Sequence, residues 1–269
     1  MTTAAVSGSF DDLRAPGMRF LEAAARLGEL HVYLWSDGVV ARASGMPPKF
    51  PEAERKYFLE AVRYVAQVTM VEALPDKDAL LEAGKPDVVA ALADDFAIQE
   101  FCDQRGLRCE VIPPERLKGF PPAPAMDLER RPGRKKVLVT GCFDWLHSGH
   151  VRFFEEAAQH GELYVIVGND ANVRNLKGEG HPLFPEDLRR YMASSIRSVH
   201  QALITSGWGW MDAEPEIEKL KPDIYLVNED GDKPEKRAFC AEHGLEYMVL
   251  ARLPAPGLEK RSSTDLRGF

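Results

Sequence analysis

The chain carries the stretch Ser7-Gly-Ser-Phe-Asp-Asp-Leu13 and, 133 positions later, the related stretch Thr140-Gly-Cys-Phe-Asp-Trp-Leu146. Around them, residues 7–40 and 140–173 align without a gap and are identical at 15 of 34 positions. Solenoid repeats are much shorter, roughly 20–50 residues, so this period indicates a duplicated domain. We therefore expect the chain to contain two copies of one domain.

The copies are expected at residues 1–116 and 135–269, joined by a linker at 117–134 that is rich in proline and charged residues. In the second copy, short apolar runs alternate with segments of helical periodicity. The expected strands are 137–140, 163–167, 202–205, 224–227 and 247–250, and the expected helices are 148–160, 185–196, 214–220 and 234–243. This alternation predicts an α/β fold, with two tandem Rossmann-like doubly wound parallel sheets.

The composition narrows the class of protein. Of 269 residues, 42 are acidic and 34 basic, a formal net charge of -8, so we expect no nucleic-acid partner. No apolar run approaches the length of a membrane span, and the amino terminus has no secretory pattern. The four cysteines are spaced irregularly and predict neither a disulfide framework nor a CxxC metal site. We therefore expect a cytoplasmic protein without a membrane partner.

Two histidines, His147 and His150, follow the first strand of the second copy and open its first helix. Residues three apart lie on one side of a helix, so both imidazoles can face the same ligand. Beside the free backbone N–H groups of a helix start, they can donate hydrogen bonds to phosphate oxygens. Such donors would stabilise the charge that develops in phosphoryl or nucleotidyl transfer. The alternatives are two surface or capping histidines, or a zinc site, for which no third ligand has a recognisable spacing.

The HxGH pattern after a Gly-x-Phe-Asp turn resembles the HxGH nucleotidylyltransferases. These include cytidylyltransferases for glycerol phosphate, phosphocholine and phosphoethanolamine, and heptose-phosphate adenylyltransferases. The resemblance covers residues 136–267 and rests on three further segments: 170–178, which ends in Lys-Gly; 185–189, which ends in arginine; and 261–267, which carries Arg-Ser-Ser-Thr. It implies tandem nucleotidyltransferase domains of which the second is active and cytidylyltransferase-like.

The resemblance also implies roles for individual residues. The catalytic residues would be His147, His150 and Lys177, with Lys177 bridging the reacting phosphates. The nucleotide would be bound by Thr140, Gly141, Cys142, Phe143, Arg261, Ser262, Ser263 and Thr264. The substrate-binding candidates are Asp144, Arg189, Asn228 and Asp230, and no metal ligand is assigned. The serine-rich segment also suits a helix start, where hydroxyls and N–H groups favour an anion.

The implied reaction moves a nucleoside monophosphate onto a small phosphorylated alcohol or sugar and releases pyrophosphate. We expect CTP as the preferred nucleotide, with ATP possible, Mg²⁺ accompanying the triphosphate, and no organic cofactor. Two departures from the family pattern concern the substrate: His181-Pro182 replaces Arg-Pro, and the Gly-Ile pair before Ser-Thr is missing. The alternatives are a sugar-phosphate type of adenylyltransferase and a regulator that binds nucleotide without turnover.

The first copy lacks the candidate chemistry. His147 aligns with Arg14, His150 with Gly17 and Lys177 with Ser44, and no Ser-Ser-Thr segment ends this copy. We expect an inactive fold partner that forms an intramolecular pseudo-dimer with the second copy, with a further homodimer possible.

Two other segments of the second copy have open roles. The loop Trp208-Gly209-Trp210 serves either packing or stacking on a base or substrate. The acidic run at 228–233 serves a cationic headgroup, Mg²⁺, or the end of a strand.

Overall fold

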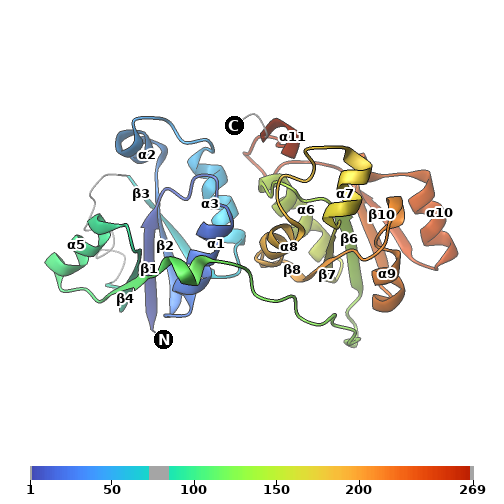
Figure 1. The fold of residues 1–269 in the computed structure, drawn as a ribbon, viewed down its shortest axis with the longest axis horizontal. Coiled ribbons are helices and arrows are strands. Elements are labelled where there is room, and N and C mark those ends of the chain that lie inside the picture. Colours follow the sequence, from blue (N-terminus) through green and yellow to red (C-terminus); the bar gives the residue numbers. More distant parts are fainter. Residues whose placement is uncertain (1, 73–84, 267–269) are drawn as a thin grey trace. The chain divides into compact units, whose positions relative to one another are not determined.

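The computed structural model describes residues 2–72 and 85–266. The chain divides into two compact units, one reaching to Gly119 and the other beginning at Phe120. Each unit is an α/β domain with one five-stranded parallel sheet, and the predicted fold class is confirmed (Figure 1). No described helix combines the length and apolar character needed to cross a membrane.

The amino-terminal unit alternates strands and helices around the sheet β3-β2-β1-β4-β5. Its described elements are β1 (Thr3–Gly8), α1 (Ala15–Ala25), β2 (Glu29–Trp35), α2 (Asp37–Ser44), α3 (Glu52–Ala61), β3 (Val65–Val71), β4 (Val88–Leu92), α5 (Phe96–Arg105), β5 (Cys109–Ile112) and the 3₁₀ turn Pro114–Leu117. The sheet is buried and rich in valine and alanine, as expected of parallel strands covered on both faces.

The carboxyl-terminal unit has the sheet β10-β9-β6-β7-β8, which is the same order when its strands are counted from its own start. Its elements are β6 (Lys136–Gly141), α6 (Ser148–Ala158), β7 (Glu162–Val167), α7 (Asp170–Lys177), α8 (Glu186–Ser194), β8 (Val199–Ile204), α9 (Glu214–Leu220), β9 (Ile224–Asn228), α10 (Pro234–Glu242), β10 (Glu246–Leu250) and α11 (Ser263–Leu266). Short 3₁₀ turns lie at Gly209–Met211 and Glu229–Gly231.

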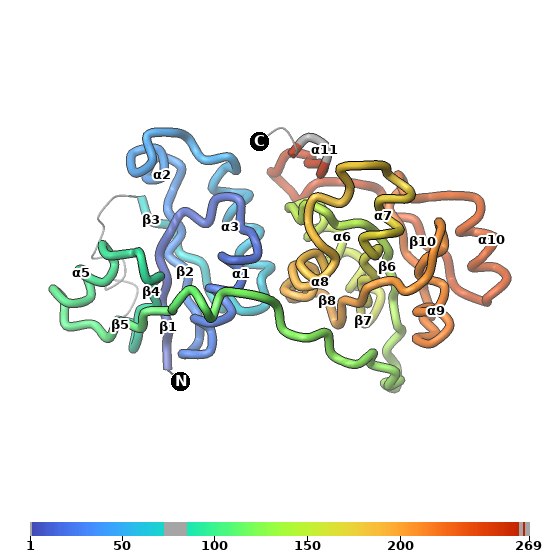
Figure 2. Tube along the Cα trace, in the orientation of Figure 1, coloured from blue at the N-terminus to red at the C-terminus, as the bar shows by residue number. Residues whose placement is uncertain are grey.

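The segment predicted as a linker is extended, but from Phe120 onward it packs on the carboxyl-terminal unit (Figure 2). The Phe120 ring lies 5.3 Å from the ring of Tyr191. Gln201 donates to the carbonyl of Ala125 at 2.8 Å and accepts from the N–H of Asp127 at 2.9 Å. These contacts also explain why β8 begins before the expected position 202. His200 and Gln201 near its start are polar and bind this segment, so the apolar pattern begins only after them.

The central strand β6 lies between β7 and β9, and the chain winds away from it in opposite directions on its two sides. Strand β6 pairs with β7 at six positions but with β9 only at Val137–Ile224 and Leu138–Tyr225. The strands therefore part toward their carboxyl ends. In doubly wound sheets, ligands bind in the crevice at this point of reversal.

Candidate active site

The turn after β6 is shaped by a close fit between Gly141 and Phe143. Phe143 has a φ of 47°, in the left-handed region that few non-glycine residues adopt. A Cβ on Gly141 would lie 2.8 Å from Cζ of Phe143, so only glycine allows the ring to fold back over the turn. The Phe143 ring then meets the His150 ring edge to face, with 5.3 Å between centroids. The turn thus places the Phe143 ring against a candidate catalytic histidine.

His147 is the N-cap residue of α6, and its side chain faces inward with 3% of its surface exposed. Its Nδ1 accepts a hydrogen bond from the N–H of Gly149 at 3.1 Å. In a neutral imidazole the other nitrogen then carries the hydrogen, so we assign the Nε2–H tautomer. Nε2 has no hydrogen-bond partner among the described residues. A buried donor without a partner is costly, and here it is available to a ligand.

Gly149 is required for this arrangement. A Cβ at that position would lie 2.9 Å from Cε1 and 3.0 Å from Nδ1 of His147. Real Cβ atoms do not approach that closely, and the neighbouring atoms belong to a ring rather than to a flexible chain end. The glycine between the two histidines therefore fixes the position of the first imidazole.

The two imidazoles form a close pair, with 4.0 Å between their centroids. Burial lowers the pKa of His147 to about 3, and the charges of Arg252 and Arg261 act in the same direction. Burial also holds the pKa of His150 well below its usual value, followed by the effects of His147, Arg252 and Lys177. Both rings are therefore uncharged at neutral pH and act as hydrogen-bonding groups.

Three cations approach the histidines from different elements. Lys177 ends α7, Lys236 lies in the first turn of α10, and Arg252 follows β10. Lys236 donates from Nζ to the carbonyl of Gly231 at 3.2 Å, and burial lowers its pKa. Arg252 pairs with Asp230 at 2.6 Å. All three cationic residues line one cavity with both histidines, which makes it suitable for a polyanion.

The cavity has a volume of about 450 Å³ and lies at the carboxyl ends of β6 and β9. That volume is within the range typical of small-molecule sites. Its lining contains most of the residues singled out from the sequence: Thr140, Gly141, Cys142, Phe143, Asp144, His147, His150, Lys177, Asn228, Asp230, Ser262 and Ser263. Residues from five separate chain segments therefore converge here.

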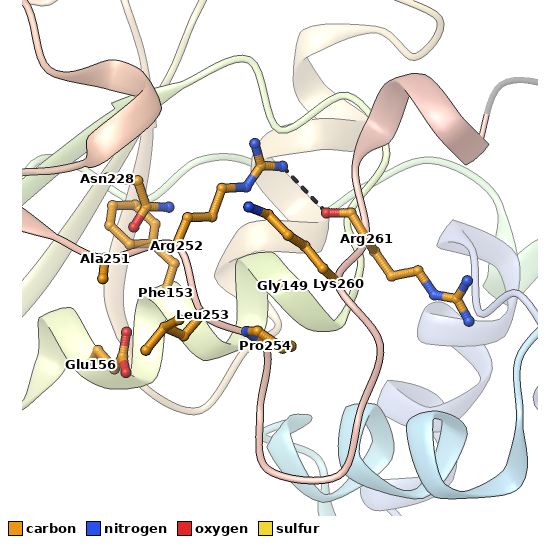
Figure 3. Close-up of a pocket in the computed structure, with 10 residues that line it drawn as sticks. All are labelled: Gly149, Phe153, Glu156, Asn228, Ala251, Arg252, Leu253, Pro254, Lys260 and Arg261. Carbon is orange, nitrogen blue, oxygen red and sulfur yellow. Dashed lines mark hydrogen bonds between the residues drawn. The ribbon is translucent and has the colours of Figure 1, made fainter.

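A smaller pocket lies between α6 and the carboxyl-terminal segment (Figure 3), and it shares Gly149, Phe153, Asn228 and Arg252 with the cavity. The Nη2 group of Arg252 donates to the main-chain carbonyl of Arg261 at 3.3 Å. The Arg261 side chain points away from the other pocket residues, and its Nη1 lies 3.3 Å from Glu259. Ser263 donates to the carbonyl of Trp145 at 3.3 Å. Thr264 lies in α11, and its side chain is outside the described part of the structure.

Comparisons with known proteins find relatives of about half of the chain. Residues 138–268 match the model of the cytidylyltransferase-like family. An FAD synthase from Aciduliprofundum boonei is 35% identical over 136 residues, which cover 49% of this chain and 84% of that protein. An FAD synthase from Ferroglobus placidus is 38% identical, with coverage of 43% and 74%. The bifunctional protein HldE of Nitratiruptor sp. is 36% identical over 126 residues, which cover 46% of this chain and 26% of that protein.

The chain belongs to the cytidylyltransferase-like family of nucleotidyltransferases. The resemblance to HxGH nucleotidylyltransferases is thereby confirmed, and the protein is an enzyme of this class. Among solved structures, the lipopolysaccharide core biosynthesis protein from Thermoplasma volcanium GSS1 is 27% identical. The matched region covers 45% of this chain and 99% of that protein's chain, with a TM-score of 0.40.

Arg189 of this nucleotidyltransferase has a different position from the one expected of a substrate ligand. It is fully buried and does not line the cavity. It donates to the carbonyls of Phe184, Cys142 and Gly168 at 2.7–2.8 Å and pairs with Asp170 at 2.5 Å. These bonds tie the loops after β6 and β7 to the start of α8. We therefore reassign Arg189 from substrate binding to positioning of the site.

Asp144 also has a positioning role, because its carboxylate accepts from the N–H groups of Leu183 and Phe184 at 2.8–3.0 Å. The amino-terminal unit has the same two sets of hydrogen bonds at the equivalent positions. Arg55 donates to the carbonyls of Phe50, Ser9 and Trp35 and pairs with Asp37. Asp11 accepts from the N–H groups of Lys49 and Phe50. Side chains that persist where the histidines are absent belong to the scaffold of the fold.

The remaining candidates are placed as follows. Asn228 ends β9 at the cavity, and Asp230 is paired with Arg252. Asp232 is paired with Arg237, so the acidic run is largely neutralised by its own neighbours. The tryptophan loop does not line this cavity: Trp208 is 63% exposed and Trp210 is 42% exposed.

Sequence reasoning did not single out Lys236 and Arg252. Both follow the carboxyl ends of strands, β9 and β10, on the side of the sheet where ligands bind. That placement is the signal that could have found them. In the sequence alone, however, they are two among 34 basic residues.

Proposed function

We propose that the carboxyl-terminal unit transfers a nucleoside monophosphate from a nucleoside triphosphate to a phosphorylated acceptor and releases pyrophosphate. One observation carries the proposal: two uncharged imidazoles, each with a buried nitrogen that has no partner among the described residues, line a cavity with three cations. Phosphate oxygens are the ligands that satisfy both sets of groups at once.

In the proposed reaction, an oxygen of the acceptor phosphate attacks the α-phosphorus. The new P–O bond forms as the bond from the α-phosphorus to the bridging oxygen breaks, and the electron pair leaves with pyrophosphate. The acceptor oxygen is already anionic, so the step needs no general base. Catalysis then rests on positioning and charge stabilisation.

The histidines would act as hydrogen-bond donors. The low pKa of His147, which follows from its burial, makes its imidazole a poor proton acceptor but leaves its Nε2–H able to bond a developing oxyanion. His150, whose ring is tilted by 31° to that of His147 with 4.0 Å between the centroids, would contact the same phosphate or the departing oxygen. In other enzymes, one such donor contributes about 10²–10³ in turnover.

The cationic side chains would contact different phosphates of the triphosphate. Lys177 would contact the reacting phosphates, and Arg252 with Ser262 and Ser263 would hold the departing pyrophosphate. Arg252 lines the cavity and takes the role first expected of Arg261, which does not line it and lies 3.3 Å from Glu259. No group of three or more metal-binding side chains occurs among the described residues. Mg²⁺ would accompany the triphosphate and offset part of its charge.

For the nucleotide we propose ATP first and CTP second. FAD is an adenylate joined to flavin mononucleotide, and the similarity to proteins named FAD synthase supports adenylyl transfer. CTP, the nucleotide preferred from the sequence, is supported by the description of the matching family model. The choice between ATP and CTP concerns recognition of the base, because the phosphates of either nucleotide would contact the same histidines and cations.

For the acceptor we propose a phosphomonoester with an apolar or aromatic body, of which flavin mononucleotide is an example. Leu176 and Leu183 flank the part of the chain that brings Lys177 to the cavity, and about half of each side chain is exposed. A cationic headgroup is disfavoured, because Asp230 is already paired with an arginine.

The amino-terminal unit, proposed as residues 1–116, would be an inactive duplicate. Its identical strand order supports duplication. So does its own left-handed phenylalanine: Phe10 has a φ of 43°, against 47° at the matching Phe143. Its pairing with the active unit as an intramolecular pseudo-dimer, a further homodimer and a cytoplasmic location stay predictions.

The test is a pyrophosphate-release screen of ATP and CTP against flavin mononucleotide, glycerol phosphate, phosphocholine, phosphoethanolamine and sugar phosphates. We expect turnover with at least one pair, and its loss in His150→Ala. His160→Ala is the matched control, because His160 is exposed just beyond the same helix. Turnover in His150→Ala equal to that of His160→Ala would contradict the proposal.

A further inference from the structure

The amino-terminal unit contains a second cavity at the equivalent point of its own sheet. Strands β1 and β4 pair only at Ala4–Val88 and Ala5–Val89, and then part toward their carboxyl ends. The cavity there has a volume of about 470 Å³, close to that of the active unit. Loss of catalytic residues has therefore not closed the crevice.

The loops around this cavity are held as firmly as those of the active unit. Arg55 is 3% exposed and bonds three carbonyls, with distances of 2.6–2.9 Å. Asp11 fixes the loop before α3 through two N–H groups at 2.8 and 3.0 Å. Glu52 accepts from the N–H of Asp37 at 2.8 Å. These are the scaffold bonds that both units share, and they keep the loops around the cavity in place.

The polar residues that line this cavity, however, differ from those of the catalytic cavity. Arg14 stands where His147 stands in the active unit, and it is tied to Asp12 at 2.5 Å. Gly17 replaces His150 and removes a ring from the space. Asp12 and Asp95 also line the cavity, where Asp12 pairs with Arg14 and Lys49 and Asp95 accepts from the N–H of Ile98. The arginine of this lining is therefore already paired with a carboxylate, and the site lacks the histidines and lysines that would hold a triphosphate in the active unit.

The cavity is instead walled by apolar and aromatic side chains. Trp35 is fixed by a hydrogen bond of 2.9 Å from its Nε1 to Oγ of Ser7. Phe10, Phe20 and Leu92 complete the apolar part of the lining. Fixed aromatic side chains suit a flat ring, and a carboxylate has about four lone-pair sites, so Asp12 and Asp95 can accept a further hydrogen bond from a hydroxyl or amino group.

We propose that this cavity is a binding site for a small aromatic molecule that carries hydroxyl or amino donors and no phosphate, of the kind represented by a free nucleoside. The site is distinct from the catalytic cavity, and its existence does not depend on the proposed reaction. It gives the amino-terminal unit a ligand of its own in place of the lost activity.

The test measures binding of adenosine and cytidine to the full chain by calorimetry, with a non-hydrolysable ATP analogue present at saturation to fill the catalytic cavity. Trp35→Leu removes the aromatic wall. Gly17→Leu fills the cavity, where a Cβ already meets only the flexible end of Leu13 at 2.7 Å. Trp208→Leu is the control, because Trp208 is exposed and lines neither cavity.

We expect at least one nucleoside to bind with a Kd below about 1 mM in the presence of the analogue. We expect about tenfold or greater weakening in Trp35→Leu and Gly17→Leu, and none in Trp208→Leu. Thermal unfolding identifies a cavity variant that fails to fold. The result then rests on the cavity variant that does fold. The proposal is overturned if neither nucleoside binds below that Kd, if the analogue abolishes binding, or if folded cavity variants bind as tightly as the control.

Discussion

Replacing Gly149 with alanine should lower turnover strongly while leaving the fold intact. The added Cβ would lie 2.9 Å from Cε1 and 3.0 Å from Nδ1 of His147, inside any contact that real Cβ atoms make. Because the Gly149 backbone is part of α6, the imidazole ring must move. Its displacement lengthens the 3.1 Å bond between Nδ1 and the N–H of Gly149 and shifts Nε2 away from the phosphate.

The size of the effect follows from the loss of one positioned donor. Such losses cost about 10²–10³ in turnover, or about 2.7–4 kcal/mol in the barrier. If the ring shifts only part of the way, the loss is smaller, and about tenfold is the least that the contact predicts. The free energy of unfolding should change little, because alanine is favoured over glycine in a helix by up to about 1 kcal/mol.

The assay is steady-state pyrophosphate release at saturating triphosphate, with unfolding by urea measured on the same samples. Gly38→Ala is the matched control, because Gly38 is likewise the second residue of a helix, α2. Its added Cβ would lie 3.4 Å from the guanidinium of Arg42 and 4.0 Å from Oγ of Ser36, which are ordinary contacts or contacts with a flexible chain end. Turnover of Gly149→Ala equal to that of Gly38→Ala would refute the reasoning, since the imidazole would then have no fixed position to lose.

Three further predictions concern the cations, the scaffold and pH. Arg252→Ala should raise the KM for the triphosphate by about tenfold or more, and Arg261→Ala should raise it less, since only Arg252 lines the cavity. Equal KM values in steady-state kinetics would contradict this. Arg189→Lys should destabilise its unit by about 3 kcal/mol and reduce turnover, whereas Arg55→Lys should destabilise its own unit similarly and spare turnover. Urea denaturation and pyrophosphate release measured on the same samples test this, and the opposite pattern would contradict it. The pKa of His147 is about 3 in the folded chain because of burial, against 6.5 as its ordinary value. Acid therefore protonates the unfolded chain first, and stability should fall as pH drops from about 6.5 toward 3. His147→Gln should flatten that dependence in urea unfolding at several pH values, and an unchanged slope would contradict it.

Much of the fold was predictable because its signals are local. The apolar run before Thr140 marked β6, and the helical spacing after Ser148 marked α6. Helix α7 was harder, since Val173 is its one buried apolar residue. The start of β8 was misplaced because His200 and Gln201 are polar, and their partners lie more than 70 residues away in sequence.

The site was predictable where chemistry and spacing coincide, as at His147 and His150. It was not predictable where a side chain's partners decide its role. Arg189 matches a family motif, yet its donors are taken by backbone carbonyls, and only coordinates reveal those partners. One sequence signal was available: Arg189 has a counterpart, Arg55, in the copy that lost both histidines. A residue kept in both copies is more consistent with a scaffold than with catalysis.

The central claim is that the two uncharged imidazoles face the reacting phosphates. The most direct measurement is a crystal structure of the protein with a non-hydrolysable triphosphate analogue and Mg²⁺. We expect α-phosphate oxygens within about 3 Å of Nε2 of His147 and within hydrogen-bonding reach of the His150 ring. A triphosphate bound with its α-phosphate beyond the reach of both rings would contradict the account.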